Sequence, residues 1–406
     1  MTFDIPRADR PEDVGFSAAR LQRLIDVLSR DIDAGLVPGA VALIARKGKI
    51  VLHEALGLRD REANAPMQRD TVFRIASMTK PLTSVAAMML AEEGKLIIAD
   101  PVSQYLPEFA ETKVAVDSDN AATLTTEPCR RPMTVQDLLR HTSGVTYAVL
   151  TGPALKQAYI DSGVGDLSLT NAEFTAKLGA LPLAYQPGTT FQYGFSTDVL
   201  GRVVEVVSGM PLDAFIEQRI CARLGMTNSG FAAVDASRAA EPQIDPATGK
   251  RPPMLRQATV KPVWISGGSG LMSTAADYLR FCQMLLDGGA LGDTRLVSPA
   301  TVALMTSDHL APDSQHGPMM HTMFGALAPV PENGIGFGLG FAVRKEAGRC
   351  ALPGSVGDYS WSGVSGTYFW IDPREELIAI LMMQAPVQRM RYRYLMRALV
   401  YQALIA

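Results

Sequence analysis

The stretch Arg74-Ile75-Ala76-Ser77-Met78-Thr79-Lys80-Pro81 decides how the rest of the chain is interpreted. It holds the only Ser-x-x-Lys sequence in the protein, and apolar residues at spacings of three and four follow it. That spacing predicts a helix with one apolar stripe, which begins near Ser77 and ends before Gly94. Ser77 and Lys80 then lie one turn apart on the same side of the helix.

This arrangement is typical of a serine nucleophile. A serine hydroxyl becomes reactive only beside a base, and Lys80 can act as that base if burial lowers the pKa of its ammonium group. The positive end of the helix favours negative charge that develops at Ser77. Taken alone, however, the four residues are better explained by an N-cap serine and a surface lysine, because such a tetrapeptide also arises by chance. The surrounding sequence has to decide between the two interpretations.

The composition excludes several classes of protein. The chain has 406 residues, of which 47% are hydrophobic and 19% charged, which indicates a globular protein large enough for two lobes. A formal net charge of −3 gives no bias toward nucleic acid. The four cysteines are widely spaced, which favours free thiols over a zinc site or a disulfide framework. No apolar run is long enough for a membrane span and no secretory signal is visible, so we expect a cytoplasmic protein without a membrane partner.

Strand signals gather at the two ends of the chain. They occur at residues 40–45, 50–56, 337–343, 366–370 and 377–383. Helix patterns cover 17–33 and 389–404, and helices alternate with loops rich in Pro and Gly between the two ends. The sequence therefore predicts an α/β (α+β) fold with two lobes. Residues 1–99 and 326–406 form an antiparallel sheet flanked by helices, and residues 100–325 form an inserted, mostly helical lobe.

Three motifs carry a resemblance to a known superfamily. Ser77-Met78-Thr79-Lys80, Tyr193-Gly194-Phe195 and Trp361-Ser362-Gly363 stand in the order and approximate spacing of the motifs of class C β-lactamases and penicillin-binding proteins. Further matching stretches are residues 138–144, 187–189, 270–274 and 366–370. Nearly the whole chain resembles the family VIII carboxylesterases, the esterase branch of that superfamily. This resemblance implies a β-lactamase-like fold, with the active site in the cleft between the two lobes.

The resemblance also implies a role for each motif. Ser77 would be the acylated nucleophile, Lys80 its activating partner, and Tyr193 the phenol that relays protons to the leaving group. The backbone N–H groups of Ser77 and Val364 would form the oxyanion hole. A half-buried tyrosine at the edge of a loop is the alternative interpretation of Tyr193. The choice of formal base between Lys80 and Tyr193 stays open, because their titrations would be coupled.

Two residues depart from the β-lactamase pattern and favour an esterase. Phe195 stands where Asn is common, and Trp361 stands where Lys or His is common. An aromatic ring can hold neither the side-chain amide nor the carboxylate of a lactam, whereas a neutral ester loses nothing. With Ser362 and Gly363, these residues would contact the substrate, and residues 362–364 would form an edge strand beside the site. Core packing is the alternative explanation of Trp361.

Other features have simpler explanations. No complete Gly-x-Ser-x-Gly occurs, so an α/β-hydrolase elbow is not predicted. Residues 308–335 are interpreted as a long irregular connection, and His316 and His321 within it as solvated loop residues rather than metal ligands. The arginines of the last helix are interpreted as a solvated face: Arg389, Arg391, Arg393 and Arg397.

Together these observations predict a serine carboxylesterase that hydrolyses short-chain or hydrophobic esters through an acyl-Ser77 intermediate. The chemistry requires no metal and no organic cofactor. The expected partner is a small-molecule ester, not a nucleic acid or a membrane, and the pattern favours no oligomeric state. The alternatives are a β-lactamase or D-amino-peptidase, an acyltransferase that uses the same site, and a non-catalytic scaffold that retains the fold.

Overall fold

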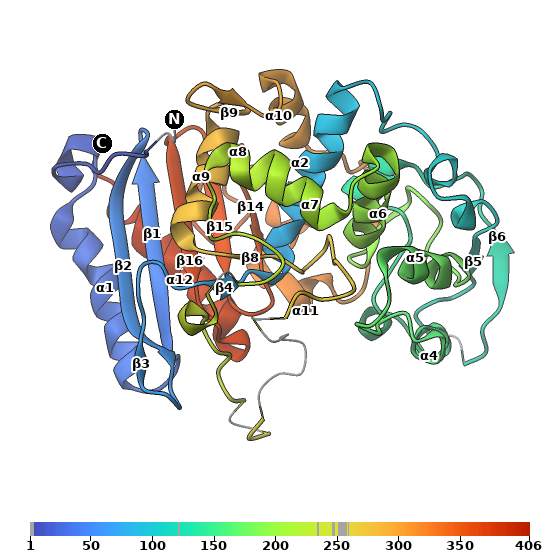
Figure 1. Ribbon diagram of the computed structural model, residues 1–406, viewed down its shortest axis with the longest axis horizontal. Coiled ribbons are helices and arrows are strands. Elements are labelled where there is room, and N and C mark those ends of the chain that lie inside the picture. The colour runs from blue at the N-terminus through green and yellow to red at the C-terminus, as the bar shows by residue number, and fades with distance from the viewer. Residues whose placement is uncertain (1–3, 121, 234, 246–247, 251–257, 259) are drawn as a thin grey trace.

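An eight-stranded antiparallel sheet joins the two ends of the chain (Figure 1). The computed structural model describes residues 4–120, 122–233, 235–245, 248–250, 258 and 260–406. The strand order is β12-β13-β14-β15-β16-β1-β2-β3. The strands are β1 (Gly39–Arg46), β2 (Lys49–Asp60), β3 (Ala65–Pro66), β12 (Ile335–Phe337), β13 (Ala342–Arg344), β14 (Tyr359–Ser362), β15 (Tyr368–Asp372) and β16 (Leu377–Met382). The predicted strand over 337–343 is thus two short strands, β12 and β13, joined by a turn.

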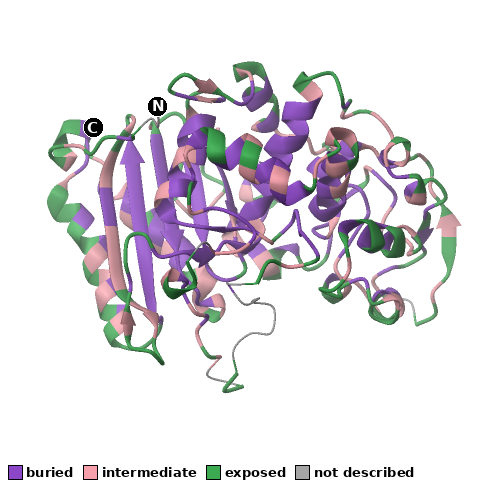
Figure 2. Cartoon of the chain, viewed as in Figure 1, coloured by how far each residue is buried: buried purple, intermediate pink, exposed green. Residues whose placement is uncertain are grey.

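Both faces of the sheet are covered by packed side chains, which explains why the sequence of β1 is continuously apolar. Val41, Leu43 and Ala45 point into the larger core, whereas Ala40, Ala42 and Ile44 point into the smaller one. Helices α1 (Ala18–Asp33) and α12 (Arg389–Tyr401) cover the smaller core, and α9 (Ala275–Leu286) packs against β16 and β1 on the other face. Figure 2 shows β1 buried along its length and β2 partly exposed, while α1 keeps one exposed side.

The remaining elements lie mainly between the two sheet-forming segments. The helices are α2 (Thr79–Glu92), α3 (Val135–Leu139), α4 (Pro153–Ser162), α5 (Asn171–Gly179), α6 (Ser196–Ser208), α7 (Leu212–Ile216), α8 (Ala222–Leu224), α10 (Pro299–Met305) and α11 (Met320–Phe324). The short paired strands are β4 (Phe73–Arg74) with β8 (Met272–Ser273), β5 (Lys113–Ala115) with β6 (Thr126–Pro128), β7 (Thr190–Phe191) with β11 (Gln315–His316), and β9 (Ala290–Leu291) with β10 (Thr294–Arg295). The lobe boundaries stay a prediction, and α9 lies on the sheet although its sequence falls in the segment assigned to the helical lobe.

Helix α2 differs from the predicted helix with one apolar stripe. Every residue from Thr79 to Leu90 is buried. The helix packs against α6 and α7 and lies between the sheet and the helical part of the chain (Figure 1). Gly94, with a φ of 70°, follows its last turn as predicted. A helix that is buried on all sides is a rigid support for the residues at its start.

The interpretation of the α12 arginines as a solvated face is wrong for Arg393 and Arg397, which are both buried. Arg397 donates to both carboxylate oxygens of Asp358, each at 2.9 Å, and Arg344 donates to the same carboxylate at 2.7 Å. A carboxylate that accepts from two guanidinium groups offsets the cost of burying their charge. The arginines of α12 therefore do not all lie on its exposed side, since Arg393 and Arg397 lie on its buried side.

Within the described residues, no helix has the length and apolar character needed to cross a bilayer. All four cysteines are free thiols, with Cys221 and Cys282 buried and Cys129 and Cys350 half-buried.

A buried carboxylate anchors the segment that follows α3. Asp137 accepts from both terminal nitrogens of Arg131, at 2.6 and 2.9 Å, and from Arg140 at 2.9 Å. The hydroxyl of Thr142 donates to it at 2.9 Å, which ties the following loop to the helix. Burial alone would raise the pKa of the Asp137 carboxyl, but the hydrogen bonds from Arg131, the Thr134 N–H and Arg140 outweigh it and lower that pKa to about 2.

This carboxylate makes the folded state sensitive to acid. Because its pKa is lower in the folded protein, its stabilising contribution is complete above about pH 4 and is lost as the pH falls toward 2. The difference corresponds to about 2 kcal/mol of unfolding free energy. We expect Asp137→Asn to be less stable at pH 7 and to show a shallower loss of stability from pH 5 to pH 3, measured by urea unfolding. A wild-type-to-variant difference that stays constant over this range would contradict the assignment.

Candidate active site

Ser77 lies in a short 3-10 turn, Ala76–Met78, directly before α2. Ala76 has a φ of 46°, in the left-handed region that residues other than glycine rarely adopt. The neighbouring Ile75 N–H donates to Leu271 O at 3.1 Å, which continues the pairing of β4 with β8. Ser77 is half-buried, whereas the helix that follows it is enclosed from Thr79 to Leu90. Strain held by the surrounding structure is typical of functional positions.

The Lys80 ammonium is buried and surrounded by oxygen atoms. Its side chain is 1% exposed, and its Nζ donates to Ser77 Oγ at 3.4 Å, Tyr147 Oη at 3.4 Å and Gly268 O at 2.9 Å. Met78 holds the N-cap position of α2, without a side-chain cap. The alternative of an N-cap serine beside a surface lysine is therefore wrong on both counts. A buried amine beside a half-buried serine hydroxyl is a suitable pair for nucleophilic catalysis.

The carbonyl of Gly268 reaches Lys80 because a second buried carboxylate holds its loop. Asp198, in α6, accepts from the Ser266 hydroxyl and from the Gly268 N–H. A Cβ added at Gly268 would collide with the Asp198 carboxylate, so only glycine fits here. The hydroxyl of Thr83, one turn beyond Lys80, donates to the Gly267 carbonyl at 2.7 Å and fixes the loop to α2.

The aromatic ring of Tyr193, the predicted proton relay, packs against the Lys80 ammonium. The Lys80 Nζ is 4.7 Å from the centre of the Tyr193 ring, within the range of a cation–π contact. The ring is 4% exposed and is flanked by His141, at 4.9 Å between ring centres, and Trp361, at 5.4 Å. Burial, followed by the charge of Lys80, lowers the pKa of His141 well below its usual value, so this histidine adds no positive charge near neutral pH.

Tyr147 is a site residue that the sequence analysis missed. Its phenol oxygen is the one that accepts a hydrogen bond from Lys80, at 3.4 Å. Burial raises the pKa of Tyr147 well above 10, and the nearby Tyr193 and Asp198 raise it further. The matched stretch 138–144 ends three residues earlier, so the only signal was a tyrosine in the same loop. The chain thus brings two phenols, not one, to the Lys80 ammonium.

The predicted edge strand over 362–364 is wrong, because β14 is an inner strand of the sheet and ends at Ser362. Strand β14 lies between β13 and β15 and ends at Ser362. Strand β13 pairs only with Tyr359 and Ser360, so the last two residues of β14 extend past it. Residues Gly363 and Val364 belong to the turn into β15, which is closed by a hydrogen bond from the Gly366 N–H to Gly363 O at 3.1 Å.

This turn is fastened to the chain before Ser77. The Ser365 hydroxyl donates to Arg74 O at 2.9 Å, and the Thr367 hydroxyl donates to Ile75 O at 3.1 Å. Gly363 lies so close that an added Cβ would stand 2.5 Å from Ile75 O. The turn and the nucleophile segment therefore form one rigid unit. Their backbone geometry leaves the N–H of Ser77, at the start of a helix, and of Val364, at the second position of a turn, outside the local pairing.

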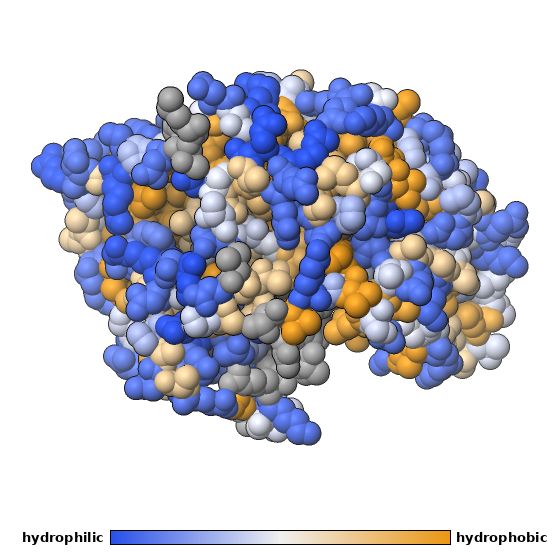
Figure 3. Space-filling model, in the orientation of Figure 1, coloured by the Kyte–Doolittle hydropathy of each residue, from blue (hydrophilic) through white to orange (hydrophobic). Residues whose placement is uncertain are grey.

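Aromatic side chains form two walls around Lys80. On one side the Phe195 ring packs against Tyr147, at 4.5 Å between centres, and against Phe174, at 5.3 Å. Trp264 stacks on Phe174 at 4.7 Å and extends this wall. Apolar side chains also gather to the right of centre on the face drawn in Figure 3, over the helical part of the chain. At positions 195 and 361 themselves, aromatic rings stand in place of the amide and the ammonium of the β-lactamase motifs.

The second wall contains Trp361. Its ring is 3% exposed and lies 5.1 Å from Phe324 and 5.2 Å from Phe337, measured between ring centres. Phe324 belongs to α11, so part of the segment predicted as an irregular connection is a helix beside the site. Trp361 therefore supports the Tyr193 ring from behind, and its contact with a substrate stays a prediction. Ser362 is half-buried at the end of β14.

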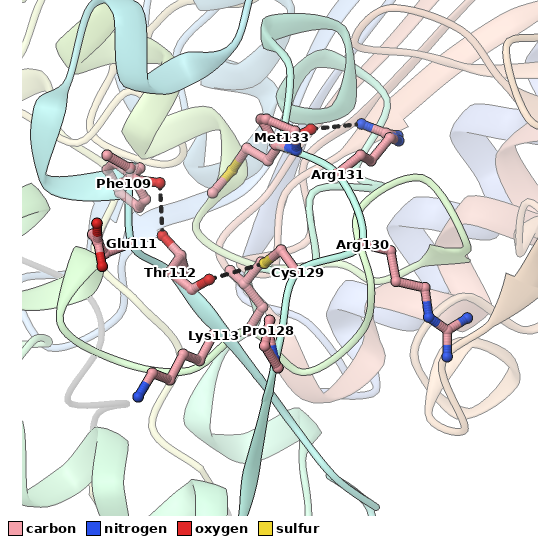
Figure 4. Close-up of a pocket in the computed structure, with 12 residues that line it drawn as sticks. Phe109, Glu111, Thr112, Lys113, Pro128, Cys129, Arg130, Arg131 and Met133 are labelled. Carbon is pink, nitrogen blue, oxygen red and sulfur yellow. Dashed lines mark hydrogen bonds between the residues drawn. The ribbon is translucent and has the colours of Figure 1, made fainter.

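A separate hollow of about 430 Å³ lies between residues 109–113 and 128–133 (Figure 4). The Cys129 thiol faces it and donates to Thr112 O at 3.0 Å. Burial raises the pKa of that thiol, which leaves it a poor nucleophile. None of the predicted site residues lines this hollow, so the arrangement around Ser77 is the candidate active site.

Comparison with known proteins decides the family. A model of the family described as Beta-lactamase matches residues 24–402. The chain belongs to the β-lactamase family. Esterase EstB of Burkholderia gladioli is 31% identical over 374 residues, which cover 91% of each chain. Protein Rv1367c of Mycobacterium tuberculosis is 39% identical over 363 residues, or 87% of each chain.

A solved structure extends this comparison to the fold. The structure described as EstCE1, a hydrolase with promiscuous acyltransferase activity, has a TM-score of 0.78 and 30% identity, and covers 96% of this chain and 99% of that one. The predicted β-lactamase-like fold is confirmed, as is the predicted membership in the esterase branch of this superfamily. Within the β-lactamase family, these relatives support a hydrolase of the esterase type.

The close approach at Gly363 yields a direct test of the rigid unit. In Gly363→Ala, the added methyl group meets Ile75 O and the Thr367 hydroxyl, so the turn must shift away from Ser77. We expect a loss of about 10²–10³-fold in kcat, the scale of removing one oxyanion donor. Gly165→Ala is the matched control, because nothing lies within 4 Å of its added Cβ. Steady-state kinetics with thermal melting of both variants would check this, and equal kinetics in the two would contradict it.

Proposed function

We propose that the protein is a serine carboxylesterase that acts through an acyl-Ser77 intermediate. The observation that carries the proposal is the buried Lys80 ammonium, 3.4 Å from both the Ser77 hydroxyl and the Tyr147 phenol. Burying an amine is costly even with hydrogen-bond partners, and such buried ionisable groups are concentrated at catalytic sites. Membership in the β-lactamase family and the esterase names of its relatives agree with this chemistry.

In the proposed mechanism, Ser77 Oγ attacks the ester carbonyl carbon while its proton passes to the Lys80–Tyr193 pair, in which either Lys80 is the free amine or Tyr193 is the phenolate. The tetrahedral oxyanion is stabilised by the N–H groups of Ser77 and Val364. The C–O bond to the alcohol then breaks, the alcohol receives a proton, and the acyl group stays on Ser77. Water attacks the acyl-enzyme by the same route and releases the acid.

Tyr147 fits the step in which the alcohol leaves. Its phenol accepts a hydrogen bond from Lys80, so its own proton is free to be donated. The raised pKa of Tyr147 keeps it protonated near neutral pH, as a proton donor requires. Tyr147 therefore protonates the departing alkoxide and recovers a proton through Lys80.

The walls of the site favour neutral, hydrophobic esters. On the Tyr147 side, the half-buried ring of Phe195 offers apolar surface but no charge, and the buried rings of Phe174 and Trp264 pack behind it. A lactam or D-peptide carries a carboxylate, and Trp361 offers no cation for it. An alcohol could also displace the acyl group in place of water, and the acyltransferase activity described for EstCE1 makes transfer the second candidate function.

The proposed function is tested with a panel of nitrophenyl esters of increasing chain length and a chromogenic cephalosporin. Wild type should hydrolyse the esters much faster than the cephalosporin, and Ser77→Ala should lose about 10³-fold or more in kcat. A fluorophosphonate probe should label wild type at Ser77 by mass spectrometry, and added alcohol should reveal any transfer product. Full ester activity in Ser77→Ala would overturn the proposal, and a protein that neither reacts nor labels would be the non-catalytic scaffold.

The roles of the two phenols can be distinguished by changing the leaving group of the ester. Tyr193→Phe should lower kcat by about 10²–10⁴-fold for every ester, because the proton of Ser77 must be accepted in each case. Tyr147→Phe should impair alkyl esters far more than nitrophenyl esters, because nitrophenolate leaves without a proton. Tyr105→Phe, whose hydroxyl donates to Asp100, is the control. Identical losses in Tyr147→Phe for both kinds of ester would exclude the assigned role.

A further inference from the structure

Arg393, on α12, lies directly behind the turn that carries the proposed oxyanion donor. Its side chain is buried at 3% exposure, and its Nη2 donates to Gly363 O at 2.6 Å. The Gly363 carbonyl also accepts from the Gly366 N–H at 3.1 Å, and the Gly363 N–H donates to Thr367 O at 2.8 Å. Both the C=O and the N–H of Gly363 are therefore hydrogen-bonded, and the strongest of these bonds is the one from the charged guanidinium of Arg393.

The burial of this guanidinium is not explained by an ion pair. In the part of the chain that the structure describes, Arg393 has no carboxylate within ion-pair distance, and its Nε has no hydrogen-bond partner. Its neighbour one turn on, Arg397, binds both oxygens of Asp358. Burial, and then the charge of Arg389, lower the pKa of Arg393 to about 10, so the group is still a cation at neutral pH. A buried cation bound to a backbone carbonyl is expensive and calls for a functional reason.

The bonded carbonyl and the proposed oxyanion donor belong to the same peptide group. The C=O of Gly363 and the N–H of Val364 share one planar trans amide, in which the two bonds point in opposite directions and their dipoles add. A guanidinium that grips the oxygen fixes the plane of that amide and so fixes the direction of the N–H. It also draws electron density toward the oxygen, which makes the N–H a stronger donor.

From this arrangement we infer that Arg393 is a positioning residue for the oxyanion hole, acting through the Gly363–Val364 peptide. The inference rests on the proposed function, because it requires the Val364 N–H to meet a negative oxygen during turnover. Arg393 itself does not touch the substrate. Its effect is largest when the carbonyl oxygen of the ester becomes an anion, so it acts on the transition state and hardly on the bound ester.

The Arg393 variants should therefore change kcat and leave KM nearly unchanged. We expect Arg393→Met, which keeps the volume but removes the charge, to lose about tenfold or more in kcat, short of the 10²–10³-fold loss that follows removal of a donor. Arg393→Lys, which keeps the charge, should recover part of that loss. The control is Arg389→Met, one turn earlier on α12, whose guanidinium donates to the Pro386 carbonyl at 2.8 Å.

Affinity for two ligands distinguishes a positioning role from a structural one. A boronic acid that forms an anionic tetrahedral adduct with Ser77 should bind Arg393→Met at least tenfold more weakly than wild type, whereas a neutral, non-hydrolysable ester analogue should bind both equally. In Arg393→Ala, millimolar methylguanidine should restore part of kcat because it can occupy the space that the side chain leaves. This rescue also serves as the second measurement if the methionine variant folds poorly.

The outcomes separate this inference from the proposed function. A wild-type protein that neither hydrolyses esters nor is labelled at Ser77 would mean that the proposed function has failed. An active wild type with Arg393→Met within twofold in kcat and in boronate affinity would overturn the inference alone. Equal weakening of both ligands, together with no rescue by methylguanidine, would assign Arg393 to the fold and also overturn it.

Discussion

The main constraint on this structure is that the buried ammonium group of Lys80 must be hydrogen-bonded to oxygen atoms. Lys80 is enclosed within a helix that is itself enclosed, and its hydrogen bonds go to three separate parts of the chain. Ser77 comes from the turn before α2, Tyr147 from the loop after α3, and Gly268 from the loop before β8. Because a buried cation without partners is so costly, these loops have to be held in place. Two buried carboxylates, Asp137 and Asp198, do this from α3 and α6.

The sheet contributes the other half of the site through backbone geometry. The turn after β14 is tied to the carbonyls of Arg74 and Ile75 by two hydroxyls, and Arg393 holds it from the opposite side. These contacts bring two backbone segments, almost three hundred residues apart in the chain, to one place. Ala76 keeps an unfavourable backbone angle at this junction, which is possible only because both sides of it are fixed.

Local periodicity predicted that Ser77 and Lys80 lie one turn apart at the start of a helix, and it predicted strands near both ends of the chain, whereas the choice of Ser77 as the nucleophile rested on the motif resemblance. Phe195 and Trp361 could be assigned to the site only through motif resemblance, because nothing local distinguishes them from core residues. Tyr147 was missed because its approach to Lys80 depends on the path of a loop, which no periodicity describes. The burial of Arg393 and Arg397 was missed because a helical pattern counts arginine as polar and cannot register a buried carboxylate or carbonyl opposite it.

The central strand pair has a consequence for how the chain folds during synthesis. Val41 of β1 is paired with Met382 of β16, so β1 cannot complete its pairing until β16 has been synthesised. Until β16 has been synthesised, β1 can pair only with β2 and keeps one unpaired apolar edge, which is prone to aggregation. Such distant pairing also slows folding. The intervening helices can fold first, whereas the central pair of strands is complete only after β16 has left the exit tunnel.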